Sequence, residues 1–137
     1  MSLTDGVVAL LADQAADLIQ ARVPGAAVSV RVAPAAADDP YRWSDAQSFT
    51  VYFDFGPARG DSVVVWLPRD DQPASALARL IDGLHELSET QAHWGTAFPV
   101  CVPGHRHPAN VDHDSDAVVL RCPQTGQVVD TIRPLDD

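Results

Sequence analysis

The stretch "SFTVYFDFGPARGDSVVVWL", residues 48–67, contains two runs in which apolar side chains alternate with other residues. In the first run Phe49, Val51 and Phe53 fall on one face of an extended chain, because successive side chains of a strand point to opposite sides. The intervening "GPARGD", residues 56–61, is typical of a hairpin connection. The stretch therefore predicts two antiparallel strands that share one apolar face.

Two amphipathic segments and one more strand flank this hairpin. Residues 3–22 and 73–93 carry apolar side chains at steps of three and four, which predicts two helices. Residues 27–33, "AVSVRVA", alternate and predict a strand. We therefore expect an α+β fold: an α-β-β-β-α two-layer sandwich with an antiparallel meander, both helices lying on its apolar face.

The C-terminal third of the chain has a different character. Residues 95–116 are rich in Gly, Pro, His and Asp and show no periodicity, whereas residues 117–132 contain two strand-like runs around "PQTG". These patterns predict an irregular loop and a C-terminal hairpin that is zinc-ribbon-like. We divide the chain into an α+β sandwich, 1–94, and a metal-binding-like loop with a hairpin, 95–137, packed on the same domain.

The composition of the chain limits the classes of partner that the protein is expected to bind. The chain has 137 residues, the length of one ordinary domain, and a formal net charge of -10. Nucleic-acid binding draws much of its affinity from basic side chains on phosphates, so this charge argues against nucleic acid and against anionic membranes. No apolar run approaches the ~20 residues of a membrane span, and the N-terminus lacks the pattern of a secretory signal. We expect a cytoplasmic protein.

The segment 100–126 holds both cysteines, Cys101 and Cys122, together with three of the five histidines. Zinc is bound by Cys sulfur and His nitrogen, with four ligands in a tetrahedron. The first loop, "CVPGHRH", and the second, "CPQTG", predict a zinc site formed by Cys101, His105, His107 and Cys122, with His113 as a substitute for one histidine. The second loop resembles a zinc-ribbon knuckle, C-P-x-C-G, but it has Thr125 at the second cysteine position.

Other interpretations of these residues stay open. The two cysteines are also compatible with ordinary buried thiols or with a disulfide, although a disulfide is rare in the cytoplasm. The stretch "HRHPANVDH" departs in spacing from the HxHxDH motif of metallo-β-lactamase-like hydrolases. A small metal- or cysteine-dependent enzyme centred on Cys101, with His105 and His107, is the alternative function.

Residues 94–135 resemble the tail of small uncharacterised actinobacterial proteins. The shared features are a helix that ends in Trp-Gly, a CPxHxHP segment and a closing CP..G hairpin. The matching residues are Trp94-Gly95, Cys101, His105, His107-Pro108, Cys122-Pro123 and Gly126. This chain departs from the pattern by the insertion of Val102 between Cys101 and Pro103. The resemblance covers about forty residues; it implies a shared fold element and no activity.

Tyr52 and Trp66 fall on the face of the predicted sheet that is opposite to its apolar face. If that face is open, it is a surface for a protein partner or for a homodimer; if it is covered, both side chains belong to the core. No assembled catalytic set is visible in the sequence. We therefore expect a non-enzymatic protein-interaction module, adaptor, chaperone-like or immunity-like, that contains a structural zinc ion and binds an unknown protein partner.

Overall fold

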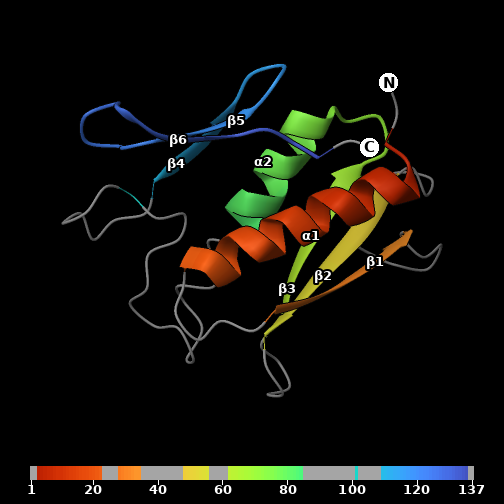
Figure 1. Cartoon of the computed structure of the whole chain (residues 1–137). Coiled ribbons are helices and arrows are strands. Elements are labelled where there is room, and N and C mark those ends of the chain that lie inside the picture. The colour runs from red at the N-terminus through yellow and green to blue at the C-terminus, as the bar shows by residue number, and fades with distance from the viewer. Residues whose placement is uncertain are drawn as a thin grey trace.

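The computed structural model describes residues 3–22, 28–34, 48–55, 62–84, 101 and 109–135. Within them the chain forms two helices and two three-stranded sheets (Figure 1). The elements, in chain order, are α1 (Asp5–Arg22), β1 (Val28–Pro34), β2 (Ser48–Phe55), β3 (Ser62–Pro68), α2 (Pro73–Gly83), β4 (Asn110–His113), β5 (Val118–Arg121) and β6 (Val128–Ile132).

The first sheet has the order β1-β2-β3, and both strand pairs are antiparallel. Val51 of β2 pairs with Val32 of β1 and with Val65 of β3, so one row of valines crosses the sheet. The alternation in the sequence is realised: Phe49, Val51 and Phe53 are fully buried. The predicted meander and the α+β class are confirmed.

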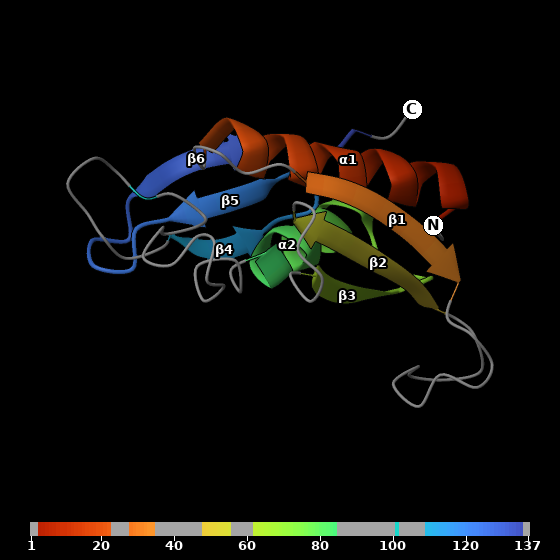
Figure 2. The same cartoon turned by 90° about the horizontal axis from the view of Figure 1, so that it is seen from below.

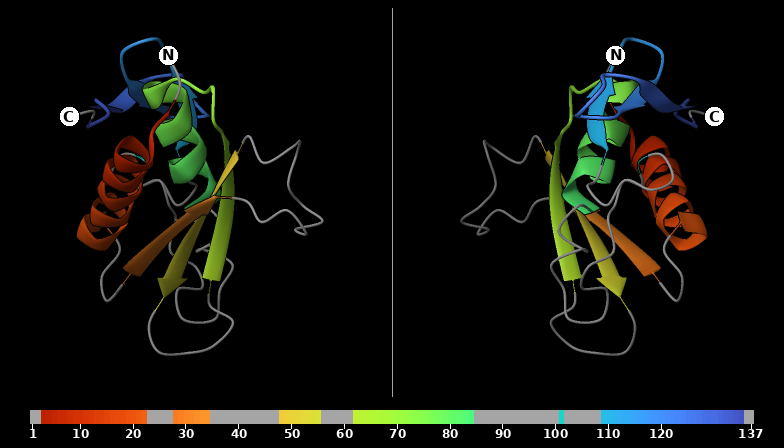
Figure 3. Two further views of the ribbon diagram at one scale, coloured as in Figure 1. Left: turned by 90° about the vertical axis from the view of Figure 1, so that its right-hand side faces the viewer. Right: turned by 90° about the vertical axis from the view of Figure 1, so that its left-hand side faces the viewer.

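Both helices lie against the apolar face of this sheet (Figure 3). The buried face of α1 consists of Val8, Leu11, Ala12, Ala15, Ala16 and Ile19. Val7, Leu10 and Leu18 also lie at steps of three and four with other apolar residues of the helix, but they are only half-buried. Three of these six buried side chains are alanines.

Helix α2 lies between the two sheets (Figure 2). It contacts β3 on one side and β4 and β5 on the other. Its large aliphatic side chains, Leu77, Leu80 and Ile81, are fully buried, and so is Leu84 immediately after it. Burial of each such side chain contributes about 1.5–3 kcal/mol. One hydrophobic cluster therefore runs from the first sheet through α2 to the second.

The second sheet has the order β4-β5-β6 and is antiparallel throughout. It confirms the predicted hairpin, since β5 and β6 lie within residues 117–132. Strand β4 was not predicted; the view of 95–116 as wholly irregular was wrong for residues 110–113. Its four side chains, of sequence NVDH, are exposed or half-buried. The strand is formed by its pairing with β5, which periodicity in so short and polar a segment does not reveal.

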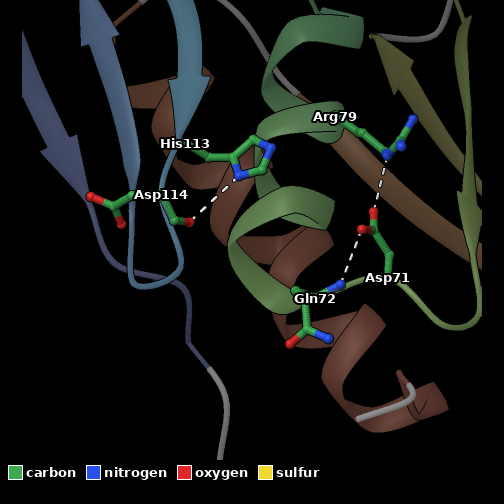
Figure 4. Close-up of polar contacts among 5 residues, drawn as sticks. All are labelled: Asp71, Gln72, Arg79, His113 and Asp114. Carbon is green, nitrogen blue, oxygen red and sulfur yellow. Dashed lines mark hydrogen bonds and ion pairs between the residues drawn. The ribbon is translucent and has the colours of Figure 1, made fainter.

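Asp71, two residues before α2, links the start of the helix to its second turn (Figure 4). The carboxylate of Asp71 accepts the backbone N–H of Gln72 at 3.0 Å and the Nε–H of Arg79 at 3.0 Å. Pro73 occupies the first turn, where a missing N–H costs nothing. The predicted helix extends to residue 93; its part from 85 onward lies outside the described residues.

The end of the described chain is held by the side chain of Gln14 on α1. Its Nε2–H donates to the carbonyl oxygen of Arg133 at 2.6 Å, and its Oε1 accepts the N–H of Leu135 at 2.9 Å. The Gln14 side-chain amide thus donates to one backbone group of this segment and accepts from another. Neither described helix combines the length and apolar character that a membrane crossing requires.

Gly83 provides a test of the packing of α2 on β3. A Cβ atom at position 83 would collide with the side chain of Val65, whereas a Cβ at Gly6 on α1 would meet no atom within 4 Å. We expect Gly83→Ala to lower the free energy of unfolding by about 1–2 kcal/mol, because overpacking outweighs the gain in helix propensity. Gly6→Ala should cause no loss. Denaturant titration measures both.

The variant Val65→Ala identifies the cause. If the clash with Val65 is responsible, Gly83→Ala should cost less in a Val65→Ala background than in the wild type. Equal costs in both backgrounds would contradict this explanation.

The contacts of Gln14 predict a local effect at the C-terminus. Gln14→Ala removes both hydrogen bonds, so we expect a loss of about 0.5–1.5 kcal/mol and faster hydrogen exchange of the Leu135 amide. Gln20→Ala is the matched control, because Gln20 donates only to Ala16 within its own helix. Unchanged exchange at Leu135 in the Gln14 variant would show that this clamp does not hold the segment.

Candidate functional site

Cys101 and Cys122 lie together although 21 positions separate them in the chain. Cys122 directly follows β5, and Cys101 belongs to no helix or strand. Both are buried, with exposed fractions of 5% and 1%, and they are not joined by a disulfide bond. The thiol of Cys101 makes a hydrogen bond to the sulfur of Cys122. The structure therefore brings the two cysteines together, and the zinc site predicted for them stays a prediction.

The turn between β5 and β6 is built around the sulfur of Cys122. The backbone carbonyl of Cys122 accepts the N–H of Gly126 at 2.8 Å, and its N–H donates to the carbonyl of Gln127 at 2.8 Å. Gly126 has a φ of 75°, a conformation that glycine adopts without steric cost. Within this turn the backbone N–H groups of Gln124 and Thr125 both donate to the Cys122 sulfur.

Thr125 connects the turn with the sulfur. Its hydroxyl donates to Cys122, and its Oγ1 accepts the backbone N–H of Gln127 at 3.2 Å. The sequence had marked Thr125 only as a position that lacks a zinc ligand; its role as a hydrogen-bond donor was missed. The C-x-x-T spacing could have indicated this role, because it places the Thr125 hydroxyl three residues after the thiol in the same turn.

These donors make Cys122 unusually acidic. The Thr125 hydroxyl, the backbone N–H groups of Thr125 and Gln124 and the Cys101 thiol lower the pKa of the Cys122 thiol from 9.0 to about 6, although burial opposes the shift. Each donor stabilises the negative sulfur more than the neutral one. These hydrogen bonds therefore favour the thiolate form of Cys122 in a buried position.

The histidines of the predicted site have different outcomes. His105 and His107 lie outside the described residues. His113 is exposed and ends β4, where its Nδ1 lies 3.4 Å from the carbonyl oxygen of Asp114. His113 pairs with Val118 at the start of β5, and Cys122 follows the end of β5. The length of the strand, about 13 Å for four residues, therefore separates His113 from Cys122. The substitution of His113 for one zinc ligand is therefore excluded by its position.

The acidic residues after β4 form a turn and not a ligand cluster. Asp114 Oδ1 accepts the N–H groups of Asp116 and Ala117, both at 2.8 Å, and the Asp114 N–H donates to the Ala117 carbonyl. The N–H groups of Asp116 and Ala117 lower the pKa of the Asp114 carboxyl. Asp114 thus stabilises the connection from β4 to β5. Among the described residues no group of three or more His, Cys, Asp or Glu side chains is arranged to hold a metal ion.

The outer face of the first sheet is neither fully open nor fully covered. Tyr52 and Trp66 are half-buried there. Arg31 stacks on the Tyr52 ring, 4.5 Å from its centroid, and forms an ion pair with Asp54 at 3.0 Å. On the same face Thr50 is 2% exposed. The aromatic side chains therefore remain accessible only in part.

The chain matches no protein-family model, no curated protein and no solved structure. The resemblance to small actinobacterial proteins stays a prediction. The site must therefore be interpreted from its own geometry.

The acidity of Cys122 predicts a pH-dependent stability of the reduced, metal-free chain. The folded-state pKa of about 6 lies below the 9.0 of an unperturbed thiol. The stabilisation is therefore complete above about pH 9 and is lost as the pH falls through about 6. We expect the free energy of unfolding to rise from pH 6 to 9 relative to that of Cys122→Ser, as measured by denaturant titration at several pH values.

Thr125 variants test the origin of this shift. Thr125→Val removes the largest contribution, so its thiolate absorbance should appear at higher pH than in the wild type. Thr125→Ser keeps the hydroxyl and should titrate nearly as the wild type does. A common titration curve for all three proteins would refute the role of the hydroxyl.

Proposed function

We propose that this chain is a non-enzymatic, cytoplasmic protein-interaction module whose C-terminal sheet is fastened by a structural zinc ion. The proposed ligands are Cys101, His105, His107 and Cys122. The observation that supports the site most strongly is the turn after β5, in which two backbone N–H groups and one hydroxyl donate to the Cys122 sulfur. Such a turn suits a thiolate ligand, because the donors carry part of the sulfur charge and fix its position.

The covalent chain limits the distance between one proposed ligand, His107, and the cysteine pair. Asn110 pairs with Arg121, so Ala109 and Cys122 are the next positions on the two neighbouring strands. Both are buried in the same cluster. Only Pro108 separates His107 from Ala109, and the covalent chain limits their Cα separation to about 7 Å. A histidine side chain at this distance can reach the cysteine pair.

Charge balance also supports a metal ion. A buried thiolate is costly unless an opposite charge accompanies it. Hydrogen bonds lower the pKa of the Cys122 thiol, while its burial opposes the charged form. Two thiolates and two neutral imidazoles around Zn²⁺ give a site of zero net charge, so the ion would relieve the cost of burying the sulfur.

Burial favours a structural role over catalysis. Reactive cysteines lie in partly exposed, electropositive surroundings. Cys101 and Cys122 are 5% and 1% exposed, and a substrate carbonyl cannot reach sulfur atoms so covered. The alternative of an enzyme centred on Cys101 has less support for this reason.

The interaction part of the proposal is supported by exclusion and by the outer sheet face. The net charge of -10 opposes nucleic-acid and anionic-membrane partners. Tyr52 and Trp66 present half-buried aromatic surface beside the exposed Arg31, and aromatic and arginine side chains are enriched at protein interfaces. A protein is thus the partner class that these features favour.

Metal analysis tests the zinc site. We expect one zinc ion per chain in protein purified without chelator, as measured by elemental analysis. Cys101→Ser and Cys122→Ser should each lose it, since either change removes a ligand. His105→Asn and His107→Asn should lower the zinc affinity by at least tenfold.

His113→Gln is the matched control, because His113 is exposed and distant from Cys122; its zinc content should equal that of the wild type. Protein that contains no metal, folds normally and gains no thermal stability from added zinc would refute the site. Loss of zinc in the His113 variant would refute the proposed ligand set.

A further inference from the structure

We infer that Cys101 and Cys122 also form a reversible disulfide bond, which replaces the zinc ion as the link between the two segments when the surroundings are oxidising. This inference rests on the proposed function only in that zinc must first leave the site. It assigns a second, redox-dependent state to the same pair of side chains.

The contact between the two sulfur atoms is the first argument. The Cys101 thiol is hydrogen-bonded to the Cys122 sulfur, and both side chains belong to the same buried cluster. A disulfide requires the two sulfur atoms to approach to about 2.05 Å. The approach shortens a contact that already exists and brings no new segment into the site.

The positions of the two cysteines in the fold are the second argument. Cys122 begins the turn between β5 and β6, residues 122–127, and its N–H and carbonyl are bonded to Gln127 and Gly126 of that turn. The Cys122 sulfur is therefore held by its turn, and Cys101 itself is not part of a described helix or strand.

The reaction needs an oxidant, and a small disulfide such as glutathione disulfide supplies it. One cysteine attacks the small disulfide, forms a mixed disulfide and releases one glutathione thiol. The second cysteine then attacks the protein sulfur of the mixed disulfide and releases the second glutathione. The protein loses two hydrogen atoms and two electrons, and glutathione disulfide is reduced to two glutathione thiols.

Burial determines when the exchange can occur. A small disulfide cannot reach sulfur atoms that belong to residues 5% and 1% exposed, so the exchange requires a local opening that exposes one of the two sulfur atoms. Bound zinc would oppose this opening and would occupy both sulfur atoms. We therefore expect the metal-bound chain to resist oxidation and the metal-free chain to oxidise.

The test uses the full chain, with and without zinc. The metal is removed by a chelator, and the protein is incubated under native conditions with excess glutathione disulfide. Remaining thiols are alkylated after acid quenching, and the intact mass is measured. We expect the metal-free wild type to lose both alkylatable thiols, to fall in mass by two hydrogen atoms and to yield a linked Cys101–Cys122 peptide pair on digestion. Dithiothreitol should restore both thiols.

Single cysteine variants provide the mechanistic control. Cys101→Ser and Cys122→Ser lack the second sulfur, so each should accumulate the mixed disulfide with glutathione. The peptide mapping of the wild type needs no variant and stands even where a variant fails to fold. If both thiols of the natively folded, metal-free wild type stay alkylatable, or if only intermolecular disulfides form, the inference is overturned.

The two proposals fail separately. Protein that never binds zinc but forms the intramolecular disulfide would refute the zinc site and support the redox pair. Protein that binds zinc but keeps two free thiols after zinc removal and oxidation would do the opposite. Addition of zinc before glutathione disulfide should slow the loss of thiols at least tenfold; an equal rate would refute the mutual exclusion of the two states.

Discussion

The burial of α2 on two sides is the constraint on which the described structure depends. Leu77, Leu80 and Ile81 fill the space between the first sheet and the second, and they have no exposed surface. Neither sheet is large: each has three strands, and a three-stranded sheet needs a packed face to be stable. The helix supplies apolar surface to both sheets, so the C-terminal hairpin belongs to the same hydrophobic core as the meander.

This arrangement also decides where the cysteine pair lies. Val118 and Leu120 of β5 are buried, and the strand therefore ends at a fixed place beside the core. Cys122 follows directly and is buried for the same reason. Its turn then directs the N–H groups of Gln124 and Thr125 toward the sulfur. The acidity of Cys122 is thus a consequence of local hydrogen bonding at a site that is positioned by hydrophobic packing.

The zinc and disulfide proposals describe two ways to avoid the energetic cost of a buried thiolate charge. The Cys122 sulfur is buried, hydrogen bonds favour its thiolate form, and the Cys101 thiol is one of the donors. A metal ion would balance the charge, and a disulfide would remove it. Both would join the segment around Cys101 to the end of β5, and each would add a link where the described chain has no helix or strand of its own.

The sequence by itself determined the elements whose pattern is local. The alternation in residues 48–55 and 62–67 indicated β2 and β3, because the period of a strand is visible in its own residues. The proline and the glycine of "CPQTG", residues 122–126, indicated the turn that follows β5. Only the tertiary structure decided the rest. Strand β4 exists through its pairing with β5, the buried face of α1 is set by the neighbours that its alanines touch, and His113 is separated from Cys122 by the length of β5. These features depend on contacts between residues distant in the chain, which no local pattern encodes.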